Sequence, residues 1–158
     1  MAGRSAGILM FRRKERLEVL LVHPGGPFFV RKDLGAWSIP KGEYDDSEDP
    51  LTAARREFAE ETGQAVEGDF LPLTAIKQKG GKEVLAWAVE GDIDAAKVSS
   101  NTFELEWPPR TGKMQKFPEI DRAEWFDLDT ARTKINERQV SLLDEVEALF
   151  GNNQPGRI

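Results

Sequence analysis

The stretch that decides the fold is residues 42–64, which reads GEYDDSEDPLTAARREFAEETGQ. Asp49 followed by Pro50 predicts the start of a helix. Aspartate caps free backbone N–H groups, and proline at the first helical position has no N–H to leave unbonded. Gly63 predicts the end of the helix, because glycine readily adopts the left-handed conformation found after helix C-termini.

This helix carries three glutamates, Glu57, Glu60 and Glu61, beside Arg56. Each helical residue advances by about 100°, so the side chains of Glu57 and Glu61 lie about 40° apart. Like charges this close repel each other unless a cation separates them, and hard divalent cations bind carboxylate oxygens. The pattern predicts a metal site, to which the backbone carbonyl of Gly42 could add a ligand. The alternative is a solvated acidic face in which Arg56 pairs with its neighbours.

The segment resembles the Nudix box. That motif has a glycine, five residues, a glutamate, seven residues, Arg-Glu, an apolar residue, any residue, Glu-Glu, any residue, a glycine and an apolar residue. The matching positions are Gly42, Glu48, Arg56, Glu57, Phe58, Glu60, Glu61 and Gly63. Gln64 departs from the pattern, at a position that serves packing in the family. The preceding residues 37–41, Trp-Ser-Ile-Pro-Lys, are similar to the lead-in strand of many Nudix hydrolases.

The resemblance implies an α/β (α+β) fold, a Nudix-like α/β/α sandwich with a mixed central sheet. It also implies metal-dependent hydrolysis of a diphosphate linkage in a nucleoside polyphosphate or another nucleoside diphosphate-linked compound. Dinucleoside polyphosphates are among the candidate substrates. The alternative is a non-catalytic Nudix-fold module that binds a nucleotide as a sensor.

The resemblance further implies that Mg²⁺ or Mn²⁺ is held by Gly42, Glu57, Glu60 and Glu61. In the family, Arg56 would orient a helix carboxylate and Glu48 would brace the loop. The general base is either a box glutamate, Glu60 or Glu61, or a distant carboxylate such as Glu119.

Composition limits the other possibilities. A chain of 158 residues that is 39% hydrophobic is expected to form one domain, residues 1–151, followed by a polar tail, residues 152–158. The absence of cysteine excludes disulfides and thiol nucleophiles, including the cysteine used by Nudix-fold isoprenoid diphosphate isomerases. No apolar run is long enough to span a membrane. We therefore expect a cytoplasmic monomer or homodimer without a membrane partner.

The net charge of −6 argues against general nucleic-acid binding and favours a small nucleotide or polyphosphate substrate. Two segments nevertheless contain Lys or Arg and no Asp or Glu. They are residues 71–82 and residues 107–118. The residues expected to bind substrate phosphates are Lys41, Lys79, Lys82, Arg110 and Lys113. For the first segment the alternative is a hairpin turn at residues 80–81. Tyr44, Phe103 and Trp107 are candidates for stacking on a nucleobase.

Hydrophobic patterning predicts a hairpin of residues 4–11 and 17–23, with His23 as a strand-end residue rather than a catalyst. Residues 24–36 should form a loop. Further strands are expected near residues 36–39, 70–77, 82–90, 101–107 and 123–128, and a final helix over residues 136–150.

Overall fold

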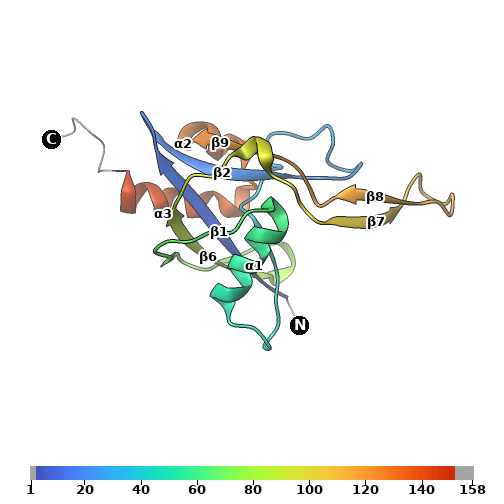
Figure 1. Ribbon diagram of the computed structural model, residues 1–158, viewed down its shortest axis with the longest axis horizontal. Helices are drawn as coiled ribbons and strands as arrows, with labels where there is room; N and C mark the ends of the chain where they lie inside the picture. Colours follow the sequence, from blue (N-terminus) through green and yellow to red (C-terminus); the bar gives the residue numbers. More distant parts are fainter. Residues whose placement is uncertain (1–2, 152–158) are drawn as a thin grey trace.

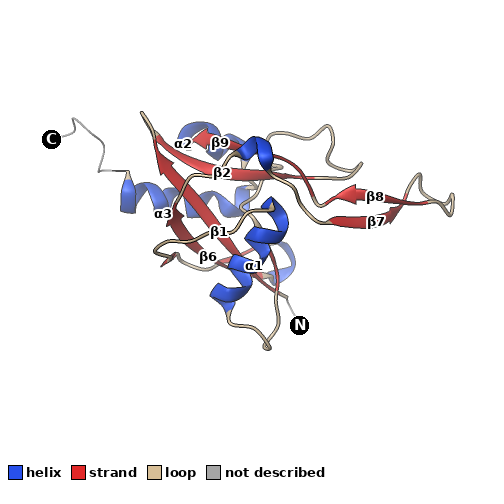
Figure 2. Ribbon diagram, in the orientation of Figure 1, coloured by secondary structure: helices blue, strands red, loops and turns tan. Residues whose placement is uncertain are grey.

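A mixed sheet forms the centre of the protein, and helices cover both of its faces (Figures 1 and 2). The computed structural model describes residues 3–151, and the expected tail lies outside that range. The path of the sheet runs β4 (Leu71–Pro72), β6 (Glu83–Glu90), β1 (Arg4–Arg13), β2 (Leu17–Pro24) and β9 (Ile120–Asp127). In addition, β3 (Lys41–Glu43) pairs with β1, and β5 (Ile76–Lys77) pairs with β6. Strands β1 and β6 are parallel, and the other pairings are antiparallel.

Strand β1 is buried on both faces because its side chains alternate between two apolar layers. Ile8 and Met10 belong to the layer that contains α1 (Pro50–Thr62). Leu9 and Phe11 belong to the layer that contains α2 (Leu128–Lys134) and α3 (Val140–Phe150). This arrangement confirms the expected α/β/α sandwich with a mixed sheet. No helix among the described residues is long and apolar enough to cross a membrane.

The segment 70–77 is not one strand, as the sequence predicted, but two short pieces, β4 and β5. Leu71 pairs with Ala88 and Ile76 pairs with Val84, so five steps along this segment face four steps along β6. The extra residue breaks the ladder as a bulge does. The turn that follows at residues 79–81 joins β5 to β6 as a hairpin.

Other boundaries also differ from the sequence prediction. The expected helix over residues 136–150 is a 3₁₀ turn (Glu137–Gln139) followed by α3, and the strand expected at 123–128 is β9, which begins at residue 120. The strand expected at 36–39 makes only isolated bridges at Trp37 and Ser38. Helix α2 was not predicted, although Asp127 caps it by accepting a hydrogen bond from the Thr130 N–H at 2.8 Å.

The second basic segment, residues 107–118, contains a strand. Strand β8 (Met114–Pro118) pairs with β7 (Thr102–Glu106) in a two-stranded sheet separate from the main one. We call residues 102–118 the arm. Figure 1 shows the arm projecting from the body of the molecule along its longest axis. Its root lies beside the C-terminal part of α1, where the Asn101 N–H donates to the Glu60 carbonyl at 3.1 Å.

Candidate active site

Helix α1 has the termini that the sequence predicts. The Asp49 carboxylate accepts a hydrogen bond from the Thr52 N–H at 3.1 Å, and Pro50 occupies the first turn. At the other end, Gly63 adopts φ 74° and donates its N–H to the Ala59 carbonyl at 2.7 Å. These caps fix the register of the helix, and the register decides which way its acidic side chains point.

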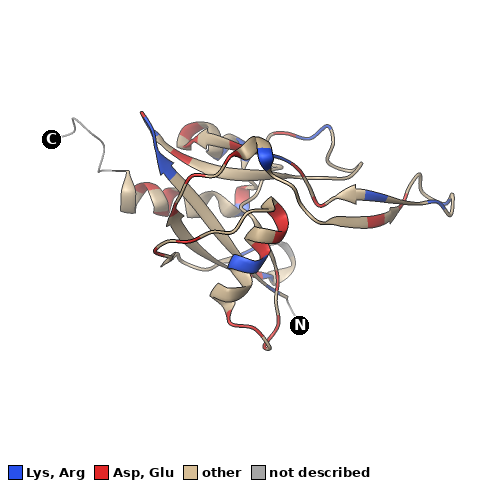
Figure 3. Cartoon of the chain, in the orientation of Figure 1, with Lys and Arg blue, Asp and Glu red and all other residues tan. Residues whose placement is uncertain are grey.

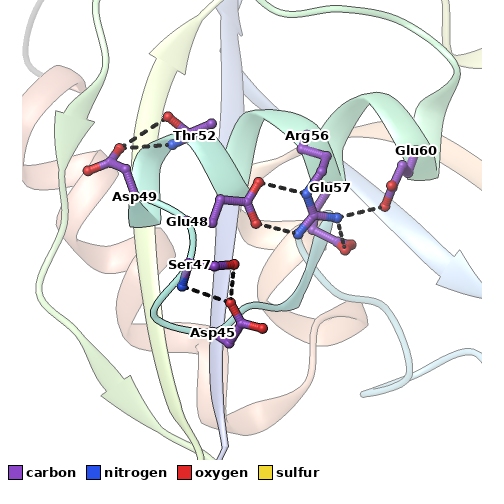
Figure 4. A network of polar contacts seen from close by, with 8 residues as sticks. All are labelled: Asp45, Ser47, Glu48, Asp49, Thr52, Arg56, Glu57 and Glu60. Carbon is purple, nitrogen blue, oxygen red and sulfur yellow. Dashed lines mark hydrogen bonds and ion pairs between the residues drawn. The ribbon is translucent and has the colours of Figure 1, made fainter.

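Arg56 joins the acidic loop before α1, residues 44–49, to the acidic face of the helix (Figure 4). Its guanidinium donates to both carboxylate oxygens of Glu48, at 2.8 and 2.9 Å, and to Glu57 and Glu60 at 3.0 and 3.1 Å. The hydrogen bonds from Arg56 lower the pKa of Glu48, and the same contact raises the pKa of Arg56. A two-pronged Arg–carboxylate pair holds a fixed geometry. Arg56 therefore links Glu48 to Glu57 and Glu60.

The Glu57 carboxylate lies directly against the backbone of Gly42. A Cβ atom built on Gly42 would stand 1.9 Å from Glu57 Oε2, so a side chain at position 42 would collide with the carboxylate. The Glu57 side chain is only 13% exposed. Burial raises the pKa of Glu57, and the nearby charge of Glu60 adds to the effect. Glycine at position 42 is thus needed for space, which the sequence pattern alone does not explain.

Glu61 lines a cavity of about 170 Å³ next to the segment that leads into β3. Its carboxylate accepts the Lys41 backbone N–H at 3.3 Å. Burial raises the pKa of Glu61 to about 8, and the charges of Glu57 and Glu119 act in the same direction. Burial also lowers the pKa of the Lys41 ammonium group. Glu119 lines the same cavity, so the distant carboxylate singled out from the sequence lies close to the box.

The cavity also has walls that sequence reasoning did not single out as functional. They come from the end of β2, from the segment before β3 and from the start of β9, and they are Val22, Pro24, Ser38, Ile39 and Ile120. The available signal was the Trp-Ser-Ile-Pro-Lys lead-in, whose second and third residues face the cavity.

The donor set fits a hard divalent cation. Glu57 and Glu61 carry raised pKa values because burial, together with the charge of neighbouring carboxylates, disfavours their ionised forms, and a bound cation would offset this cost. The described residues contain no group of three or more His, Asp or Glu side chains already arranged around one point. One reason is that the Glu60 carboxylate is paired with Arg56. Ion binding at all three glutamates would therefore require Glu60 to exchange this partner.

Two of the expected substrate-binding residues are engaged elsewhere. Lys82 forms an exposed ion pair with Glu43 at 2.8 Å. Tyr44 is half-buried against the layer that contains α1, and the Arg4 guanidinium lies 5.1 Å from its ring centre. Neither residue lines the cavity. The side chain of Lys79 lies outside the described residues.

The remaining expected residues lie on the arm. Arg110, at φ 64°, and Lys113 are in its turn, and Figure 1 places this turn at the end remote from α1. Phe103 is half-buried near the root, with its ring centre 6.0 Å from that of Phe117. The structure thus brings together Glu48, Arg56, Glu57, Glu60, Glu61, Lys41 and Glu119, and it separates the arm cations from them.

Comparison with known proteins identifies the family to which this arrangement belongs. The family model for the NUDIX domain matches residues 1–146. The chain belongs to the Nudix family. The Nudix match covers the whole sheet and all of α1, so the box helix and the cavity beside it belong to one family domain.

The relatives of this chain are named for different activities. The chain is 30% identical over 141 residues to an RNA pyrophosphohydrolase of Bartonella henselae, covering 80% of this chain and 77% of that protein. It is 30% identical over 103 residues to the asymmetrical bis(5′-nucleosyl)-tetraphosphatase of Mus musculus, covering 57% and 66%. The structure of an Ap4A hydrolase binary complex from C. elegans superposes with a TM-score of 0.62 at 24% identity, covering 94% of this chain and 97% of that one. That likeness supports the fold.

Proposed function

We propose that this Nudix protein is a pyrophosphohydrolase that uses Mg²⁺ or Mn²⁺ to hydrolyse a diphosphate linkage in a nucleoside polyphosphate. The observation that carries the proposal is the convergence of Glu61, Lys41 and Glu119 on one cavity beside the Arg56 network. The names of the relatives support the reaction class, since both act on phosphate anhydrides of nucleotides.

Glu57, Glu60 and Glu61, with the Gly42 carbonyl, would hold the cation. A bound divalent cation supplies Lewis-acid chemistry, because it withdraws electron density from phosphoryl oxygens and offsets their charge. Arg56 keeps the Glu57 carboxylate directed away from solvent, and Glu48 keeps Arg56 in place. Lys41 lines the cavity and gives a positive charge for the phosphate that it faces.

In the proposed reaction, a water oxygen forms a bond to phosphorus and the bridging P–O bond breaks. Glu119 takes the proton from this water, and the leaving phosphate departs with the bonding electron pair. Both Glu61 and Glu119 line the cavity, but Glu61 would hold the cation and the Glu60 carboxylate is bonded to Arg56, so Glu119 is assigned as the base. A correctly placed base typically contributes a factor of about 10²–10⁴.

The proposal is tested by assaying purified protein with Mg²⁺ and Mn²⁺ on ATP, a dinucleoside tetraphosphate and a 5′-triphosphorylated oligoribonucleotide. Released phosphate, pyrophosphate and mononucleotides are measured. The expected result is metal-dependent turnover of at least one compound, lost on addition of EDTA and in Glu57→Gln. Binding of nucleotide without turnover under every condition would instead support the non-catalytic alternative.

A further inference from the structure

The arm and the loop of residues 25–36 form one continuous surface. A Cβ atom on Gly26 would stand 2.9 Å from the Phe103 ring, and the Phe28 and Trp107 rings meet edge to face with centres 5.4 Å apart. On β7, Phe103 and Leu105 are half-buried, whereas Glu104 and Glu106 are exposed. The apolar face of the arm therefore packs on the loop.

This surface is unusually apolar for one in contact with solvent. The large exposed hydrophobic residues of the described chain lie mostly on it. They are Phe28 at 59%, Phe29 at 38%, Val30 at 63%, Leu34 at 72% and Met114 at 60%, with only Leu71 and Leu149 elsewhere. A contiguous exposed apolar patch of this kind marks an interaction site.

The same surface carries cations without acidic partners, and Figure 3 shows Lys and Arg on both the loop and the arm. Its cations are Arg31, Lys32, Arg110, Lys113 and Lys116, of which Lys116 stands opposite Glu104 in the pairing of β7 with β8. Within residues 3–151, none of these five takes part in an ion pair, although many other Lys and Arg side chains do. The Glu106 carboxylate accepts the N–H groups of Arg110 and Gly112, at 3.3 and 3.0 Å, so it is used within the turn.

The surface begins at the proposed active site. The Gly25 N–H donates to the Glu119 carbonyl at 2.9 Å, and the Glu119 N–H donates to the Asn101 carbonyl at 2.8 Å. Trp107 stands six residues along the arm from Asn101. At about 3.3 Å per residue, this places the aromatic pair roughly 20 Å from the root. A base stacked there belongs to a nucleotide well beyond the one whose phosphates lie in the cavity.

We infer that the arm and the loop of residues 25–36 bind a single-stranded polynucleotide whose 5′ polyphosphate lies in the cavity. Exposed rings stack on bases of any sequence, and unpaired cations match the backbone phosphates. At the minimum stacked spacing of about 3.4 Å per nucleotide, roughly six nucleotides reach from the root to Trp107. This inference names the substrate class of the proposed function. Only its link to catalysis rests on that function. The net charge of −6 does not oppose it, because the cations are local.

The test separates binding from chemistry. A fluorescent hexaribonucleotide with a 5′-hydroxyl is titrated by anisotropy into the protein in EDTA, where no hydrolysis takes place. Trp107→Ala and the double variant Arg110→Ala with Lys113→Ala are compared with the wild type. Lys97→Ala, which removes an exposed cation outside the surface, is the matched control.

The expected result is saturable binding that weakens about 10-fold in Trp107→Ala and does not change in Lys97→Ala. In the double variant, the slope of log K against log salt should become shallower by about 1.4, at about 0.7 for each lost cation. The double variant alters only exposed side chains, so it remains informative if Trp107→Ala proves less stable.

Wild-type protein that fails to bind the hexanucleotide, or equal affinity in all variants, would overturn the inference. So would capture of anionic vesicles in place of the hexanucleotide. In Mg²⁺, the arm variants should lower kcat/KM for a 5′-triphosphorylated hexanucleotide while leaving ATP turnover within twofold, and equal losses on both would also overturn it. If the hexanucleotide binds but no compound is hydrolysed, the proposed function fails and the binding surface stands.

Discussion

Replacement of Glu61 by glutamine is expected to stabilise the metal-free protein at pH 8 while it lowers turnover. Burial raises the pKa of Glu61 from its ordinary 4.5 to about 8. Between these values the folded protein keeps a proton that the unfolded chain has lost. The free energy of unfolding therefore falls as pH rises through this window. Glutamine does not titrate, so the variant escapes this loss.

The size of the effect follows from the shift. At about 1.36 kcal/mol per pKa unit, the difference between the two values sets an upper bound of roughly 5 kcal/mol at pH 8. Glu61 borders a cavity that can admit water, which reduces the penalty, so we expect about 1–3 kcal/mol. At pH 5 the difference between Glu61→Gln and wild type should nearly disappear. For a domain of this size the pH 8 effect corresponds to a rise in Tm of about 2–12 °C.

The assay is urea and thermal unfolding in EDTA at pH 5 and pH 8. Glu43→Gln is the control. The hydrogen bond with Lys82 lowers the pKa of Glu43, so the change in unfolding free energy at pH 8 should have the opposite sign to that of Glu61→Gln. Mg²⁺ should then raise the Tm of wild type more than that of Glu61→Gln, since the variant has lost a ligand. The reasoning is refuted if Glu61→Gln shifts stability equally at both pH values.

Three further outcomes are expected. Gly42→Ala should lower kcat at least 10-fold by displacing the Glu57 carboxylate, and wild-type kinetics would show that this contact does not matter. Glu119→Gln should lower kcat about 10²–10⁴-fold with Mg²⁺ affinity nearly unchanged, as measured by kinetics across Mg²⁺ concentrations; a parallel loss of both would make Glu119 a ligand. His23→Leu should cost about 1–3 kcal/mol in urea unfolding, because the fully buried ring bonds to Asp121 at 2.8 Å and its partners would be left unpaired. A cost below about 0.5 kcal/mol would contradict this reading.

Much of the site could be predicted from local sequence. The caps at Asp49 and Gly63 and the spacing of Glu57, Glu60 and Glu61 are properties of one helix, so they need no tertiary information. The same holds for the pairing of Arg56 with Glu60, one turn apart. The hydrophobic patterning of residues 4–11 and 17–23 likewise predicted the hairpin that β1 and β2 form. For the same reason, His23 was correctly placed on a strand, although its two hydrogen bonds were not foreseen.

The tertiary structure decided what depends on contacts between distant segments. Sequence patterning could not show that Glu119 approaches Glu61, because this requires β9 to pair with β2. It could not show that Arg110 and Lys113 lie away from the glutamates, because the pairing of β7 with β8 carries them outward. Local propensity determines helices and caps, whereas register between strands determines which side chains share a cavity, and register is a property of the whole sheet.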